Sequence, residues 1–297
     1  MRPEQNAEVI FENIAIVGVG LIGGSLGMAA RKRSLARRVI GLGRSEQKLM
    51  RAKILGAIDD YSLDIDHAAA DSDLVVICTP VTLIVPVLGR MAASLKKGAV
   101  VTDVGSTKRE IVEQASAVVP PGRHFVGGHP MAGSEQTGVE AAIPDLFLGA
   151  TYVLTPNEHT DLAALGKLAA FAEAIGANVE EMSPEDHDAA AAVISHLPHA
   201  MAGALLGAAE DAQREFGVVY KLAAGSFRDL TRISDSSPEI WRDICSTNTD
   251  SLAAAIDSFV SHLSRFRAAL TERDEEELER FFRQASEIRR AYLRISK

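Results

Sequence analysis

The sequence predicts an α/β fold, in which a doubly wound parallel sheet of the Rossmann type is followed by an all-helical domain. Strand-like and helix-like segments alternate over the first part of the chain, and Ala-rich or charged helical sequence fills the rest. A glycine-rich turn follows the first expected strand. Because 297 residues are enough for two domains, we place them at residues 1–183 and 184–297.

Apolar runs bounded by turn residues predict the strands and helices of the first domain. The expected strands are residues 14–18, 38–43, 73–80, 99–105, 124–128, 152–156 and 178–182, and the expected helices include 46–57, 82–95, 108–118 and 160–175. Strands that alternate with helices in this way form a parallel sheet. The sheet should therefore end near Ser183-Pro184.

The second domain is read from long tracts of small and charged residues that lack strand patterning. Its last helix carries an apolar stripe that includes Leu278, Phe281, Phe282 and Ile288 among many charges. Such a stripe is typical of a core face or a contact between subunits.

Composition excludes several functional classes. Acidic residues outnumber basic ones by 40 to 31, and the net charge of −9 is a poor match to a nucleic acid backbone. The two cysteines are far apart, and neither a Cys pair nor H-E-x-x-H is present, so we expect no disulfide framework and no metal site. We expect no export signal and no membrane partner, which favours a cytoplasmic protein.

The turn Gly18-Val19-Gly20-Leu21-Ile22-Gly23 has the G-x-G-x-x-G spacing and stands between a strand and a helix. The first glycine permits the turn, Gly20 lets the backbone approach a pyrophosphate, and Gly23 allows close packing of helix and strand. The helix N-terminus then offers N–H groups to the anion. All six residues are expected to bind a dinucleotide.

The end of the second strand bears on the choice of cofactor. An acidic residue there would bind the ribose 2′-hydroxyl of NAD, but Gly43-Arg44-Ser45 stands in its place. Arg44 and Ser45 can both bond a 2′-phosphate, so we expect NADP to be favoured, with NAD possible. The alternative is that Arg44 is a solvated cation or stacks on adenine.

Two further strand ends belong to the same edge of the sheet, where ligands of such folds bind. They supply Thr79 and Pro80 after one strand and Asp103 and Gly105 after the next. We expect these four residues to line the cofactor site.

Polar clusters interrupt the apolar sequence in a fixed order. They are Asp103-Val-Gly-Ser-Thr-Lys108, Gly127-Gly-His-Pro-Met-Ala-Gly-Ser-Glu135, His187-Asp188, Ser195-His-Leu-Pro-His199 and Phe227-Arg-Asp-Leu-Thr-Arg232. With these motifs, the chain from about residue 14 to Trp241 resembles the prephenate/arogenate dehydrogenase family, the cyclohexadienyl dehydrogenases of tyrosine biosynthesis.

The resemblance implies an oxidative decarboxylation. Hydride from C4 of prephenate or arogenate passes to NADP⁺ or NAD⁺, the C4 hydroxyl loses its proton, and carbon dioxide leaves as the ring becomes aromatic. His129 matches the family's catalytic histidine, and Ser106 matches the serine near nicotinamide and the substrate hydroxyl. An imidazole with a pKa near 6.5 is suited to accept that proton.

The resemblance also implies a set of substrate-binding residues. Arg232 matches the residue that holds the ring carboxylate, and a guanidinium can do so with two parallel bonds. His187 is expected to orient the surroundings of Arg232 or an interdomain hinge. The remaining candidates are Ser195, His196, His199, Glu135 and Trp241.

Pro198 stands among the histidines of this set. In a helix it leaves the carbonyl of Ile194 without its usual bond, which predicts a kinked pocket wall.

Two other functions remain open from the residues. One is another dehydrogenase with a Rossmann and a helical domain, acting on a 3-hydroxyacid or an imino acid, and the other is a dinucleotide-sensing protein without turnover. The resemblance implies a homodimer and tyrosine as a competitive inhibitor. The preference between prephenate and arogenate is open, with Glu135 and Asp145 as acidic residues that could set it.

Overall fold

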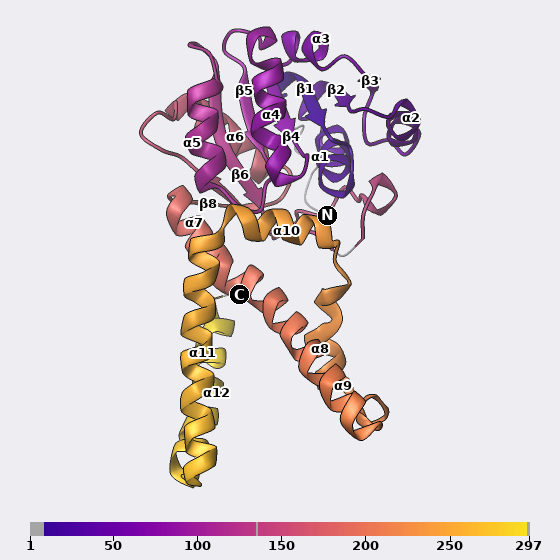
Figure 1. Cartoon of the computed structure of the whole chain (residues 1–297). Coiled ribbons are helices and arrows are strands. Elements are labelled where there is room, and N and C mark those ends of the chain that lie inside the picture. The colour runs from indigo at the N-terminus through magenta and orange to yellow at the C-terminus, as the bar shows by residue number, and fades with distance from the viewer. Residues whose placement is uncertain (1–8, 135, 296–297) are drawn as a thin grey trace, which may run out of the picture. The chain divides into compact units, whose positions relative to one another are not determined.

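The computed structural model describes residues 9–134 and 136–295, and it contains an eight-stranded sheet (Figure 1). The strands are β1 (Phe11–Val17), β2 (Ala36–Leu42), β3 (Asp60–Ser62), β4 (Leu74–Ile77), β5 (Val100–Asp103), β6 (His124–Pro130), β7 (Thr151–Thr155) and β8 (Asn178–Glu181). Their spatial order is β3-β2-β1-β4-β5-β6-β7-β8. The chain reverses direction along the sheet after β3, and β1 and β4 are neighbours there, as in a doubly wound fold. The predicted fold class is confirmed.

The sheet departs from the prediction in two details. The segment of β3 and the following helix α3 (Ile65–Ala70) was not predicted, because three residues are too short to show a period. β7 pairs antiparallel with β6, whereas the other neighbouring strands are parallel. In the described part of the connection between β6 and β7, the chain forms a short 3₁₀ turn, η2 (Val139–Ala141), and no crossover helix that would return it for a parallel strand.

Helices cover both faces of the sheet. They are α1 (Leu21–Lys32), α2 (Glu46–Ile54), α4 (Val81–Met91, continued by the 3₁₀ turn η1, Ala92–Ser94), α5 (Arg109–Val118) and α6 (Leu162–Ala174). Within β1, Ile14 and Ile16 pack with α1 and α6, while Ala15 and Val17 pack with α3, α4 and α5. Alternation between two buried faces explains why the strands are apolar throughout.

Helices follow β8, and the described residues beyond it form no further strand. They are α7 (Pro184–Ala191), a π turn η3 (Ala192–His196), α8 (Leu197–Phe216), η4 (Val219–Leu222), α9 (Gly225–Thr231), η5 (Arg232–Asp235) and α10 (Pro238–Thr247). Ser183 caps α7 by accepting the N–H of Asp186. α7 packs on α5, and α10 packs on α4, so these helices belong to the same compact unit as the sheet, which ends at Asn248.

A second compact unit begins at Thr249 and consists of α11 (Thr249–Glu272) and α12 (Glu275–Ile295). The two helices are joined by an aromatic cluster, in which the ring of Phe266 lies 4.8 Å from that of Phe281 and 5.8 Å from that of Phe282. Part of the predicted apolar stripe of the last helix, Phe281 and Phe282, thus packs against α11.

One helical run, Pro184–Phe216, is long and apolar enough by length and composition to cross a membrane, with a mean hydropathy of 1.4. Its first turns nevertheless carry His187, Asp188 and His196, which are buried and hydrogen-bonded to other elements of the first unit. These bonds tie the start of the run into the fold of that unit. The apolar composition reflects its many alanines.

Candidate active site

The turn between β1 and α1 forms an open cradle at the carboxyl edge of the sheet. Gly18 has a φ of +94°, and a Cβ on Gly23 would lie only 2.3 Å from the Gly18 carbonyl oxygen. A Cβ on Gly20 would meet no described atom within 4 Å. Gly20 is the N-cap of α1, whose first turn carries no acidic side chain. Open space therefore faces the N–H groups of a helix N-terminus, which fits a phosphate group.

The remaining motif residues support this cradle. Val19 and Ile22 are partly buried against the sheet core, and Leu21 begins the helix. After β4, the strand that pairs with β1, the hydroxyl of Thr79 is buried and has no hydrogen-bond partner among the described residues. Pro80 follows as the N-cap of α4. An orphaned hydroxyl beside the cradle is a polar group that a bound dinucleotide could satisfy.

The residues expected to select the cofactor lie after β2. Arg44 is exposed. Ser45 is the N-cap of α2 and accepts the N–H of Lys48 at 3.4 Å. The hydroxyl of Ser45 thus has a structural role of its own, and Arg44 is the group that can extend to a ligand.

Asp103 at the end of β5 is a buried anchor. Its carboxylate pairs with the ammonium of Lys108 and accepts the N–H groups of Gly105, at 2.8 Å, and Gly128, at 3.2 Å. The side chains of Asp103 and Lys108 are both completely buried, and burial lowers the pKa of Lys108 although the carboxylate opposes this shift. Asp103 thereby fixes the start of the β5–α5 loop and the end of β6.

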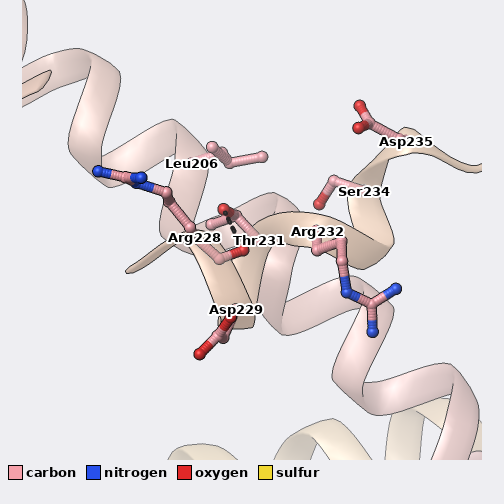
Figure 2. Close-up of a pocket in the computed structure, with 7 residues that line it drawn as sticks. All are labelled: Leu206, Arg228, Asp229, Thr231, Arg232, Ser234 and Asp235. Carbon is pink, nitrogen blue, oxygen red and sulfur yellow. Dashed lines mark hydrogen bonds between the residues drawn. The ribbon is translucent and has the colours of Figure 1, made fainter. Parts of the chain in front are cut away.

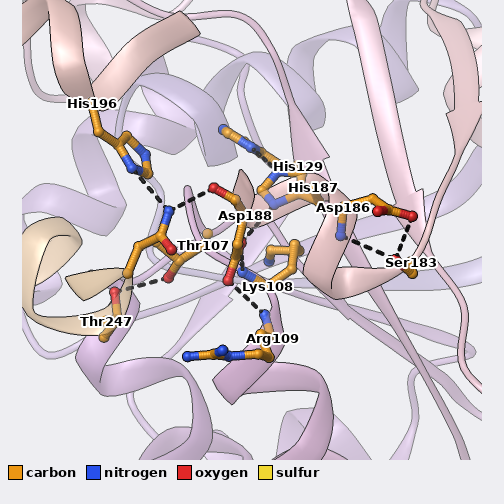
Figure 3. A network of polar contacts seen from close by, with 12 residues as sticks. Thr107, Lys108, Arg109, His129, Ser183, Asp186, His187, Asp188, His196 and Thr247 are labelled. Carbon is orange, nitrogen blue, oxygen red and sulfur yellow. Dashed lines mark hydrogen bonds and ion pairs between the residues drawn. The ribbon is translucent and has the colours of Figure 1, made fainter. Parts of the chain in front are cut away.

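His129 lies near the carboxyl end of β6, next to Gly128, and starts a polar network (Figure 3). Its Nδ1 lies 2.8 Å from Nε2 of His187, and Nδ1 of His187 lies 2.8 Å from Oδ1 of Asp188. Burial, with His187, Lys108 and His196 nearby, holds the pKa of His129 well below 6.5. His129 is therefore an uncharged imidazole at neutral pH, as a proton acceptor must be.

The structure gives His187 two partners that the sequence did not predict. Its two ring nitrogens bond His129 and Asp188, and the expected role at Arg232 or at a hinge stays a prediction. Contacts between residues this far apart in the chain depend on how α7 packs, which local sequence does not encode.

A second histidine cluster is joined to this network through Asn248. The amide of Asn248 donates to the carbonyl of Asp188 at 2.8 Å and lies 3.2 Å from Nδ1 of His196. The side-chain NH2 of Asn248 donates to both, so Nδ1 of His196 is an acceptor and carries no proton. The neutral ring of His196 therefore carries its proton on Nε2. That atom is buried and has no partner among the described residues, and burial lowers the pKa of His196 to about 4.

His199 and Trp241 complete this cluster. The rings of His199 and Trp241 are stacked at 3.6 Å, and His196 meets Trp241 edge-on at 6.0 Å. Nδ1 of His199 donates to the carbonyl of Ser195 at 2.9 Å. A π turn, η3, ends at His196 directly before α8, and Pro198 is in the first turn of α8. Such turns often occur at functional sites.

Arg232 is the first residue of η5. It is exposed and lines an open pocket whose other lining residues are Leu206, Arg228, Asp229, Thr231, Ser234 and Asp235 (Figure 2). None of the histidines described above is among these lining residues. The structure thus brings His129, His187, His196, His199 and Trp241 into two linked clusters, and Arg232 lines the open pocket.

Three other residues named in the sequence analysis remain. Ser106 is half-buried in the β5–α5 loop and makes no hydrogen bond within the described residues. Glu135 lies outside the described residues. Asp145 is bound by Lys32 and Arg33, which leaves it a surface ion pair.

The sequence analysis missed three polar residues: Lys108, Asp188 as an anchor, and Asn248. Lys108 and Asp188 stand inside quoted motifs, and their position next to apolar sequence is the signal that could have found them. Asn248 carries no such signal.

Comparison with known proteins identifies the family. A family model described as the nucleotide-binding domain of prephenate dehydrogenase matches residues 26–181, and one described as its dimerization domain matches residues 183–284. The prephenate dehydrogenase of Bacillus subtilis is 39% identical over 279 residues, covering 94% of this chain and 75% of the relative. The cyclohexadienyl dehydrogenase of Zymomonas mobilis is 34% identical, covering 95% and 96%.

A solved structure agrees with these relatives. The prephenate dehydrogenase of Aquifex aeolicus, in complex with hydroxyphenyl propionate and NAD⁺, superimposes with a TM-score of 0.87. It is 33% identical, and the match covers 95% of this chain and 98% of that one. The chain therefore belongs to the prephenate dehydrogenase family, the oxidoreductases that carry out the oxidative decarboxylation of tyrosine biosynthesis.

Proposed function

We propose that the chain oxidatively decarboxylates prephenate, arogenate or both, with His129 as the general base. The observation that carries the proposal is the uncharged imidazole of His129, held at the carboxyl end of β6 by its bond to His187. The hydroxyphenyl propionate in the Aquifex aeolicus relative supports a hydroxyphenyl product here. A nicotinamide dinucleotide in the cradle at Gly20, beside the orphaned hydroxyl of Thr79, supplies the hydride acceptor.

The balance of electrons and protons in the reaction defines the role of His129. The C4–H bond breaks with its electron pair leaving as hydride, and the bond to the ring carboxylate breaks with its pair entering the ring. These two changes make the ring aromatic without a net loss of the hydroxyl proton. His129 therefore accepts that proton as positive charge develops at C4, and returns it to the oxygen as carbon dioxide leaves.

The substrate's carboxylates need donors in a chain of net charge −9. We assign Arg232 to the ring carboxylate, because a guanidinium can make two parallel bonds to it. The buried Nε2–H of His196, which has no partner among the described residues, supports a role in binding for the cluster of Ser195, His196, His199 and Trp241. Ser106 is assigned to the substrate hydroxyl, and Glu135 and His187 complete the proposed set.

Further proposals concern cofactor and assembly. NADP is favoured over NAD by exposed Arg44 and by the lack of an acidic residue at Gly43. The match of residues 183–284 to a dimerization domain supports a homodimer, and it supports the division into a dinucleotide-binding domain, 1–183, and a helical domain, 184–297.

Tyrosine shares the ring size and side chain of arogenate, which supports competitive inhibition. The biosynthetic activity supports a cytoplasmic location.

The test is steady-state kinetics with prephenate and arogenate, each combined with NAD⁺ and with NADP⁺. We expect turnover with at least one substrate and a higher kcat/KM with NADP⁺. Arg44→Ala should raise the KM for NADP⁺ about tenfold or more, since a charged hydrogen bond is lost, and leave the KM for NAD⁺ nearly unchanged. Arg37→Ala, an exposed arginine of β2, is the matched control.

Two outcomes would contradict these proposals. Absence of turnover with either substrate would refute the reaction, and a much higher kcat/KM with NAD⁺ than with NADP⁺ would refute the assignment of Arg44.

A further inference from the structure

A buried pair, His187 and Asp188 at the start of α7, lies behind His129 and is bonded to its ring. We propose that Asp188 and His187 are positioning residues, which fix the ring tautomer of His129 so that Nε2 is its proton acceptor. This inference deepens the proposed function and rests on His129 being the base.

Asp188 is the fixed end of the chain of bonds. Its Oδ1 accepts the backbone N–H of Lys108 at 2.7 Å, and its Oδ2 accepts that of Arg109 at 3.0 Å. Backbone N–H groups only donate, so the carboxylate is held as an acceptor and cannot rotate. The same contacts cap the N-terminus of α5 and connect α7 to it.

The direction of the next two bonds follows from this anchor. Oδ1 of Asp188 accepts from Nδ1 of His187, so the neutral ring of His187 has its bare nitrogen at Nε2. That atom lies 2.8 Å from Nδ1 of His129, which must therefore carry a proton and donate it. The neutral ring of His129 is left with a lone pair on Nε2, the nitrogen that the network does not use.

Burial makes this arrangement stable. The side chains of His187 and Asp188 are only 2% and 3% exposed, so water does not compete for their bonds. The charged or titratable groups around His129 are Lys108, with its partner Asp103, together with His196, His187 and Asp188. Asp188 is the carboxylate in the bonded chain, and its charge favours the imidazolium that forms when His129 takes the substrate proton.

Two substitutions at His187 distinguish the loss of its hydrogen-bond acceptor from the loss of its ring. His187→Gln keeps an oxygen that can accept from Nδ1 of His129, whereas His187→Phe keeps a ring but removes the acceptor. We expect His187→Phe to lower kcat by about 10²-fold, with the KM for substrate and cofactor little changed, and His187→Gln to recover most of the rate. His159→Gln, on an exposed loop, is the control and should match the unaltered enzyme.

A spectroscopic measurement reads the tautomer without turnover. Long-range ¹H–¹⁵N correlation spectra of the full-length, ¹⁵N-labelled protein report which ring nitrogen of His129 carries the proton. We expect the Nδ1–H form in the unaltered protein and in His187→Gln, and a mixture with the Nε2–H form in His187→Phe.

Three results would overturn the proposal: an Nε2–H form of His129 in the unaltered protein, a His187→Phe enzyme as fast as the unaltered one, or a slow His187→Phe enzyme whose His129 tautomer is unchanged. The spectrum of the unaltered protein tests the proposed tautomer of His129 even if His187→Phe does not fold. An unaltered protein with the expected tautomer but without turnover would count against the proposed function alone.

Discussion

Single residues set the chemistry of the site through their surroundings rather than their type. The imidazole of His129 is uncharged because burial lowers its pKa, and its bond to His187 determines which nitrogen is bare. Gly20 leaves a space that no described atom fills, while Gly23 leaves no space at all. The sequence predicted His129 and the glycines from their motif, but the partners of His129 come from distant segments and were not predictable.

The two glycines give a test at this scale. Gly20→Ala should raise the KM for the cofactor while leaving the melting temperature nearly unchanged, because its Cβ would enter the open space proposed for the phosphate and meet no described atom. Gly23→Ala should lower the melting temperature, because its Cβ would lie 2.3 Å from a backbone oxygen. Thermal unfolding and cofactor titration of both variants check this. Equal effects of the two substitutions on stability would refute the role assigned to Gly20.

Secondary-structure elements are held at the site by buried polar bonds between them. Asp103 ties the β5–α5 loop to β6, and Asp188 ties α7 to α5. The strands and helices themselves were largely predictable, because apolar runs and capping residues are local signals. The short β3 and the reversed direction of β7 were not, since a three-residue strand has no measurable period and strand direction depends on the connection.

A substitution of Lys108 tests whether these buried polar bonds hold the elements in place, because its ammonium is the buried partner of Asp103. Lys108→Met should lower the free energy of unfolding by about 3–5 kcal/mol, the usual cost of leaving a buried charge without its partner. Chemical denaturation measures this, with Lys48→Met on the exposed face of α2 as the control. A loss below about 1 kcal/mol, the range of a surface ion pair, would show that the pair does not brace the site.

Across the whole chain, the net charge of −9 offers no general positive field, so the proposed anionic ligands need a few placed donors. The sequence predicted the family, the sheet and the helical second half from ordered motifs. It did not predict that α7, α8 and α10 would pack into one compact unit with the sheet, nor that Asn248 would link two histidine clusters. Those contacts arise from tertiary packing.

The central claim is that His129 is the base of the dehydrogenase reaction, and the pH dependence of kcat/KM for the unaltered enzyme and His129→Ala tests it most directly. Because burial lowers the pKa of His129, the rate of the unaltered enzyme should fall on the acid side at a pH below 6.5. His129→Ala should be slower by about 10²- to 10⁴-fold, should lack that acid limb and should still bind cofactor. An undiminished rate, or the same acid limb in His129→Ala, would contradict the claim.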